Sequence, residues 1–99
     1  MNAIGQLEAF FDAIADDHRV GTVHISLYLA LFRAWLKNEC RNPVVLERSS
    51  IMQDAKIRAR STYSKCMREL HDYGYLRYKP SFNNNLRSIA MVIPLAEPR

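Results

Sequence analysis

The first part of the chain carries apolar residues at helical spacing. Leu7, Phe10, Phe11 and Ile14 recur at intervals of three and four residues, and acidic side chains occupy the opposite side. This pattern predicts a short amphipathic helix over residues 5–16.

A longer apolar stripe begins after Val20-Gly21 interrupts the first pattern. It predicts a helix over residues 22–40, with Thr22 as its N-cap, and we expect this helix to be the main element of the core. Asn42-Pro43 ends it because proline disfavours helical geometry in the residue before it. Residues 44–46 then have the composition of a brief β-type segment.

Two shorter helices are predicted in the middle of the chain. Ser50 and Gln53 match a capping box, which predicts a helix over residues 50–55. The next helix is predicted over residues 61–73, with Ser61 or Arg60 as its cap. It ends at Gly74, where a left-handed residue is favoured.

The last part of the chain is typical of a β-hairpin at about residues 75–93. Tyr75 to Lys79 alternate as a strand, the asparagines at 83–85 predict a turn, and Ile89 to Ile93 form the return strand. Two helices joined by a tight turn and followed by a hairpin predict a winged helix-turn-helix. The expected fold class is mainly α with a small β-hairpin (α+β), in a single domain spanning residues 1–99.

Composition is consistent with one globular domain and excludes several other classes. The chain has 99 residues, of which 48% are hydrophobic and 24% charged, as in globular domains. The longest apolar stretch, residues 25–36, contains Ser26 and Arg33 and is too short to cross a bilayer. No export signal is recognised at the start, so we expect a cytoplasmic protein without a membrane partner.

The positive charge is concentrated in one third of the chain. The net charge is +4, but residues 56–88 hold eight bases and two acids, which gives +6, whereas residues 1–20 carry −3. Such a block is typical of a surface that contacts phosphates. The alternative is a solvated helix face beside an acidic helix.

The helix predicted over residues 61–73 has an apolar and a polar face. Tyr63, Cys66, Met67 and Leu70 share the apolar face, which we expect to pack in the core. Hydroxyls and bases on the opposite face suit contacts with phosphates and base edges. The candidate DNA-binding residues are Lys56, Arg58, Arg60, Ser61, Thr62, Ser64, Lys65 and Arg68, together with Lys79, Asn84 and Arg87 in the hairpin.

This helix and hairpin resemble those of bacterial winged-helix transcription regulators. The shared pattern includes Ser61-Thr62-Tyr63, Cys66-Met67, Leu70 and Gly74-Tyr75-Leu76. With the stretch from His24 to Trp35, the chain is similar to small bacterial winged helix-turn-helix transcriptional regulators of the type often encoded on mobile elements. The resemblance covers about residues 10–88. It implies a role in transcription or as an accessory factor of a mobile element.

No pattern in the sequence indicates an enzyme, a cofactor or a metal centre. The chain holds no glycine-rich phosphate loop, GxSxG or HExxH motif. Cys40 and Cys66 lack CxxC spacing, so both are expected to be buried free thiols, and Cys66 and His71 have no second ligand pair for zinc. His24 is expected to be a capping or core histidine.

The sequence therefore predicts a protein that binds double-stranded DNA, with helix 61–73 in the major groove and wing 79–88 on the backbone. No small-molecule effector is evident, and apolar surface at Phe10 and Phe11 points to a homodimer through the N-terminal helices. The alternative is a protein–protein interaction (adaptor) module whose basic helix docks an acidic partner. The two differ in whether the bases form one positive face without acidic partners.

Overall fold

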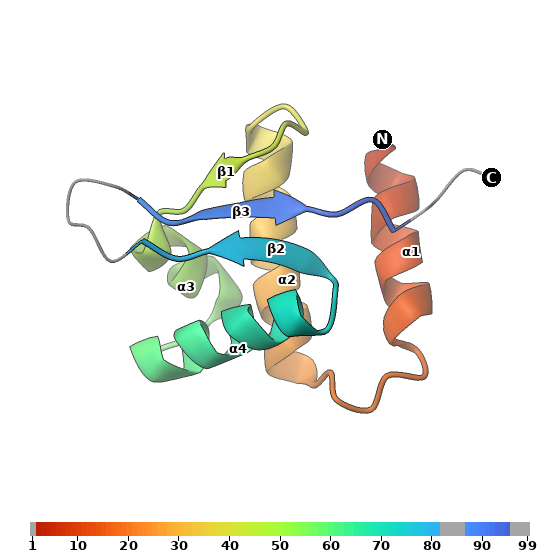
Figure 1. The fold of residues 1–99 in the computed structure, drawn as a ribbon, viewed down its shortest axis with the longest axis horizontal. Coiled ribbons are helices and arrows are strands. Elements are labelled where there is room, and N and C mark those ends of the chain that lie inside the picture. Colours follow the sequence, from red (N-terminus) through yellow and green to blue (C-terminus); the bar gives the residue numbers. More distant parts are fainter. Residues whose placement is uncertain (1, 82–86, 96–99) are drawn as a thin grey trace.

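Seven elements follow one another in the computed structural model, which describes residues 2–81 and 87–95 (Figure 1). The helices are α1 (Ala3–Ile14), α2 (Thr22–Lys37), α3 (Arg48–Ala55) and α4 (Arg60–Asp72), and the strands are β1 (Val44–Val45), β2 (Leu76–Lys79) and β3 (Ile89–Val92). The expected mainly helical α+β class is confirmed. None of the described helices is long and apolar enough to cross a membrane.

The strands form one antiparallel sheet in the order β1-β3-β2. Leu76 of β2 pairs with Val92, and Val44 of β1 pairs with Ala90. The side chain of Asn42 extends the β1 side of the sheet, because its amide donates to the Val92 carbonyl at 2.9 Å and accepts from the Val92 N–H at 3.0 Å. The brief β-type segment predicted at 44–46 is thus the third strand of a sheet and not an isolated extended stretch.

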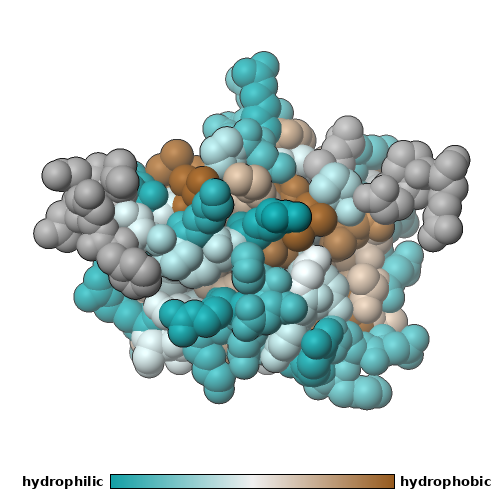
Figure 2. Space-filling view, in the orientation of Figure 1, coloured by the Kyte–Doolittle hydropathy of each residue, from teal (hydrophilic) through white to brown (hydrophobic). Residues whose placement is uncertain are grey.

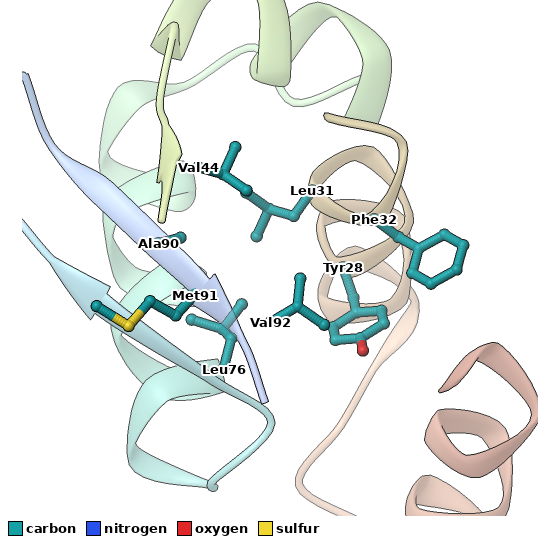
Figure 3. Close-up of a pocket in the computed structure, with 8 residues that line it drawn as sticks. All are labelled: Tyr28, Leu31, Phe32, Val44, Leu76, Ala90, Met91 and Val92. Atoms are coloured by element: carbon teal, nitrogen blue, oxygen red, sulfur yellow. The ribbon is translucent and has the colours of Figure 1, made fainter. Parts of the chain in front are cut away.

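The main core lies between α2 and the sheet, as the apolar stripe of this helix predicts. Trp35 and Leu27 of α2 and Met67 and Leu70 of α4 are fully buried. Figure 3 shows apolar side chains of α2 and the strands around a cavity of about 10 Å³. This volume is about that of one water probe, and its apolar lining offers no cluster of hydrogen-bonding partners, so the cavity is a packing gap and not a ligand site.

The ends of the first two helices differ from the predicted ones. Helix α1 begins at Ala3, before residue 5, because the Asn2 carboxamide oxygen accepts from two backbone N–H groups of the first turn. Helix α2 ends at Lys37 and not at residue 40, since Glu39 and Cys40 have φ angles of 57° and 56°. Cys40 is consequently exposed and its predicted burial is wrong.

Three of the helices have N-caps other than the predicted ones. The N-caps are Gly21 in place of Thr22, Glu47 in place of Ser50, and Ala59 in place of Ser61 or Arg60. His24 takes one of its two predicted roles, because its Nδ1 accepts a hydrogen bond from the Gly21 N–H at 3.0 Å. The predicted end of α4 is confirmed by Gly74, whose φ of 89° favours glycine.

Candidate nucleic-acid interface

Helix α4 presents a polar row on the side away from its core face. Tyr63, Cys66, Met67 and Leu70 are buried as predicted, and Cys66 is a free thiol. Ser61, Lys65 and Arg68 are exposed at intervals of four and three residues, so they share the outward side, while Thr62 and Ser64 are half-buried beside them. Figure 2 shows hydrophilic side chains over this part of the molecule and hydrophobic ones along the sheet above it.

Further bases lie around the start of α4. Lys56 and Arg58 stand in the turn between α3 and α4, Arg60 is the first residue of α4, and all three are exposed. Lys79 is exposed at the end of β2. Within residues 2–81 and 87–95, no acidic side chain forms an ion pair with these four bases, or with Lys65 or Arg68.

Arg87 differs from these six bases. Its guanidinium lies 2.7 Å from the Glu47 carboxylate. The Leu46 N–H donates to the Ser88 carbonyl, and this bond brings Glu47, the residue before α3, close to Arg87, which lies two residues before β3. Asn84, the remaining candidate, lies outside the described residues.

Side chains from the loop before α2 and from α2 itself hold α4 in place. His24 Nε2 lies 2.9 Å from the Glu69 carboxylate, and the Arg19 guanidinium lies 4.1 Å from the centroid of the Tyr73 ring. On the other side, His71 Nδ1 accepts from the Tyr78 N–H of β2 at 3.0 Å. The position of the exposed row therefore depends on contacts with three other parts of the chain.

The atoms of His24, Cys66 and Glu69 that could ligate a metal lie within 4.8 Å of one another. However, Nδ1 of His24 accepts from Gly21, so in the neutral ring Nε2 carries the proton that is shared with Glu69. A metal on Nε2 would require the opposite tautomer and would turn an Nδ1 proton toward the Gly21 N–H. Burial also raises the pKa of the Cys66 thiol, and the nearby Glu69 adds to this rise. These residues fit a hydrogen bond between His24 of α2 and Glu69 of α4, with the Cys66 thiol beside it, better than a metal site.

Asp17 clamps the loop between α1 and α2 onto the start of β2. Its carboxylate accepts from the Arg19 side chain through two bonds of 2.8 Å and from the Tyr75 hydroxyl at 2.6 Å. The hydrogen bonds from Arg19, and then the one from Tyr75, hold the pKa of Asp17 well below its ordinary value of 3.8. The clamp joins the α1–α2 loop to the connection between α4 and β2.

We expect the Asp17 clamp to make stability depend on acid pH. Because the folded pKa is lowered, the contribution is present above the unfolded pKa and is lost as pH falls through the folded one. Asp17→Asn should therefore lower stability at neutral pH and flatten its decline below about pH 4. Urea unfolding followed by circular dichroism from pH 7 to pH 2 measures both effects. An acid decline as steep as that of the wild type would contradict the assignment.

Comparison with protein families, with curated proteins and with solved structures finds no match to this chain. The local geometry is therefore the basis for a functional conclusion. The sequence pattern predicted the exposed polar residues of α4, but it did not predict the contacts that hold α4 in place. Arg19, two residues after Asp17, was the only local signal of the clamp, and nothing in the sequence pairs Asp17 with Tyr75.

Proposed function

We propose that this chain is a winged helix-turn-helix domain that binds duplex DNA, with α4 in the major groove. The order of elements supports this, because α3 and α4 are joined by residues 56–59 and the β2–β3 hairpin follows as a wing. The observation that carries the proposal is the exposed row of Ser61, Lys65 and Arg68. Its two bases have no acidic partner within the part of the chain that the structure describes.

The start of α4 adds to the attraction for phosphate. The first N–H groups of a helix and the positive end of its dipole favour anions. Lys56, Arg58 and Arg60 are exposed at this same end, so side-chain and backbone groups of one sign act together. Bases at the start of the helix would contact the backbone, and bases along it would reach guanine edges.

The backbone at Lys56 is a second supporting observation. Lys56 follows α3 with φ 62° and ψ 35°, a left-handed conformation that glycine adopts at lower cost. A lysine in this conformation is consistent with a role for its side chain, since strained residues concentrate at functional sites. A phosphate contact by Lys56 is consistent with this.

A second candidate function is an adaptor that docks an acidic protein surface through α4. The observation that favours it is the Arg87–Glu47 pair, which neutralises the one described base between β2 and β3 that the wing would offer to DNA. In this case the α4 bases would remain attractive to carboxylates, whereas of the described bases in residues 79–88 Lys79 alone would be left to contact a duplex.

A salt titration with duplex DNA tests the proposal. The anisotropy of a labelled random-sequence duplex, titrated with the protein, should give a Kd of about 10⁻⁴ to 10⁻⁶ M near physiological salt. If about five phosphates are contacted, log K should fall against log salt with a slope of about −4 to −5. Absence of binding even at low salt would overturn the DNA proposal and favour the adaptor.

A further inference from the structure

Exposed apolar side chains gather on α1 and α2. Of the six large hydrophobic residues that the structure leaves exposed within its described part, five lie on these helices, and all but Val23 of α2 recur at matching intervals of seven residues. These four are Ile4, 73% exposed, and Phe11, 44% exposed, on α1, and Leu29 and Leu36, 38% and 43% exposed, on α2. Phe10, which the sequence offered as surface, is instead fully buried.

The two helices run antiparallel side by side and touch through a ring stack. In Figure 1, α1 descends from the N-terminus and α2 rises again from the connecting loop. Phe10 of α1 stacks on Tyr28 of α2 with ring centroids 3.7 Å apart, and Gln6 donates to the Tyr28 hydroxyl at 2.9 Å. These contacts fix which sides of the two helices face each other.

Helix geometry places the exposed residues on one side of this pair. Successive residues of an α-helix are rotated by about 100° around its axis. Ile4 and Phe11 are therefore rotated about 100 to 120° from Phe10 around the axis of α1, and Leu29 and Leu36 about 80 to 100° from Tyr28 around the axis of α2. In an antiparallel pair of helices, residues rotated by equal angles from the two contact residues lie on the same side of the plane that contains both helix axes. Half-buried Leu7 and Ile25 lie about 60° beyond the contact residues, so they join the same surface. We call these six residues the α1–α2 face.

The charges of the two helices are opposite. Helix α1 carries Glu8 and Asp12 and no base, whereas α2 carries Arg33 and Lys37 and no acid. Arg33 already pairs with Asp54 of α3 at 2.8 Å, so Lys37 is the base of α2 that has no acidic partner among the described residues. A second copy that placed its α1 on α1 would bring acids together. A copy that places its α2 on α1 brings acids to bases, and the two-fold symmetry repeats the same contact.

We propose that the α1–α2 face is a homodimer interface in which α1 of each copy lies on α2 of its partner. The two-fold axis then runs parallel to the helices and lies between the two faces. The partner supplies both the apolar row and the charge that this face requires. The apolar residues provide most of the burial, and the charges select this arrangement over its alternative.

This arrangement also fixes where the two α4 helices lie. His24, near the start of α2, contacts Glu69 of α4, so α4 crosses that end of α2. A two-fold axis parallel to α2 leaves both α4 helices at the same end of the dimer. If the proposed DNA binding holds, both copies would present α4 toward one duplex; the dimer itself does not depend on that function.

Sedimentation equilibrium of the full chain tests the dimer. The wild type is expected to dimerise at micromolar concentration, and Phe11→Ser and Leu29→Ser should each raise the dimer Kd by tenfold or more. Val45→Ser is the matched control, because Val45 is 57% exposed but lies on β1, away from this face. Circular dichroism confirms that each variant is folded. A monomeric wild type, or a dimer that these substitutions leave unchanged, would overturn the proposal.

The charge of residue 8 distinguishes the two arrangements. With α1 on the partner's α2, Glu8→Lys should weaken the dimer, and salt should weaken the wild-type dimer. With α1 on α1, both effects should have the opposite sign, so a dimer strengthened by Glu8→Lys would contradict the arrangement. Lys65→Ala should leave the dimer unchanged, which separates a failure of DNA binding from a failure of dimerisation.

Discussion

The double variant Lys65→Ala, Arg68→Ala is expected to bind duplex DNA about 100-fold more weakly than the wild type. Both side chains are exposed on the outward side of α4 and pair with no acid among the described residues, so their charge is available to a ligand. Each contact is expected to contribute roughly a factor of ten. Alanine keeps helix propensity, so α4 should remain folded.

The salt dependence shows what kind of contact is lost. If both residues contact phosphates, the slope of log K against log salt should become less steep by about two. If Arg68 instead contacts a guanine edge, the loss should depend on sequence, with a smaller change of slope. Fluorescence anisotropy on random and selected duplexes separates these cases.

Arg41→Ala is the matched control for this experiment. The Arg41 side chain is 77% exposed, and it pairs with Glu39 at 3.6 Å. Arg41 belongs to the connection between α2 and β1, which begins at the end of α2 opposite to α4 (Figure 1). The control should bind DNA as the wild type does. The control removes one charge and the double variant two, so an equal loss of binding free energy per charge removed would mean that net charge alone, and not α4, determines binding.

The features predicted correctly are those encoded by local spacing. Tyr63, Cys66, Met67 and Leu70 recur at intervals that place them on one side of a helix, and tertiary packing followed that pattern. Gly74 ends α4 because few other residues adopt its φ at low cost. Such information lies within a few residues of the chain and is available before the chain folds.

The features that were missed depend on partners far away in the sequence. Gln6 bonds to the backbone of Leu95, and Asp17 bonds to Tyr75. A polar residue in an amphipathic helix ordinarily faces water, so spacing gives no sign that Gln6 is buried. The predicted caps were wrong for a related reason. Thr22 and Ser50 offer capping hydroxyls, but the backbone enters the helix one residue before Thr22 and three residues before Ser50.

Gln6→Ala is expected to lower the free energy of unfolding by about 3 kcal/mol. Gln6 is fully buried, and its Nε2 donates to the Tyr28 hydroxyl at 2.9 Å and to the Ile93 carbonyl at 2.8 Å. Its Oε1 accepts from the Leu95 N–H at 3.0 Å. The variant removes all three bonds and leaves two backbone groups without this partner, and it also opens a gap between α1 and α2.

Urea unfolding followed by far-ultraviolet circular dichroism measures this loss. The midpoint should fall with little change of m, because the same surface is exposed on unfolding. Gln53→Ala is the matched control, since Gln53 is exposed on α3, and its effect should stay within about 0.5 kcal/mol. A free energy of unfolding equal to that of the control would show that the Gln6 side chain does not stabilise the packing of α1.

The same variant links the stability of α1 to the proposed dimer. Gln6 and Phe10 are the side chains through which α1 contacts Tyr28, so loosening Gln6 should disturb the register of α1 on α2. Ile4 and Phe11 would then no longer be aligned with Leu29 and Leu36 in a single face. Because a self-complementary interface needs this alignment in both copies, Gln6→Ala should also raise the dimer Kd, although Gln6 itself is buried within one copy. Sedimentation of Gln6→Ala under conditions where it remains folded measures this coupling, and a dimer of wild-type strength would show that α1 keeps its position without Gln6.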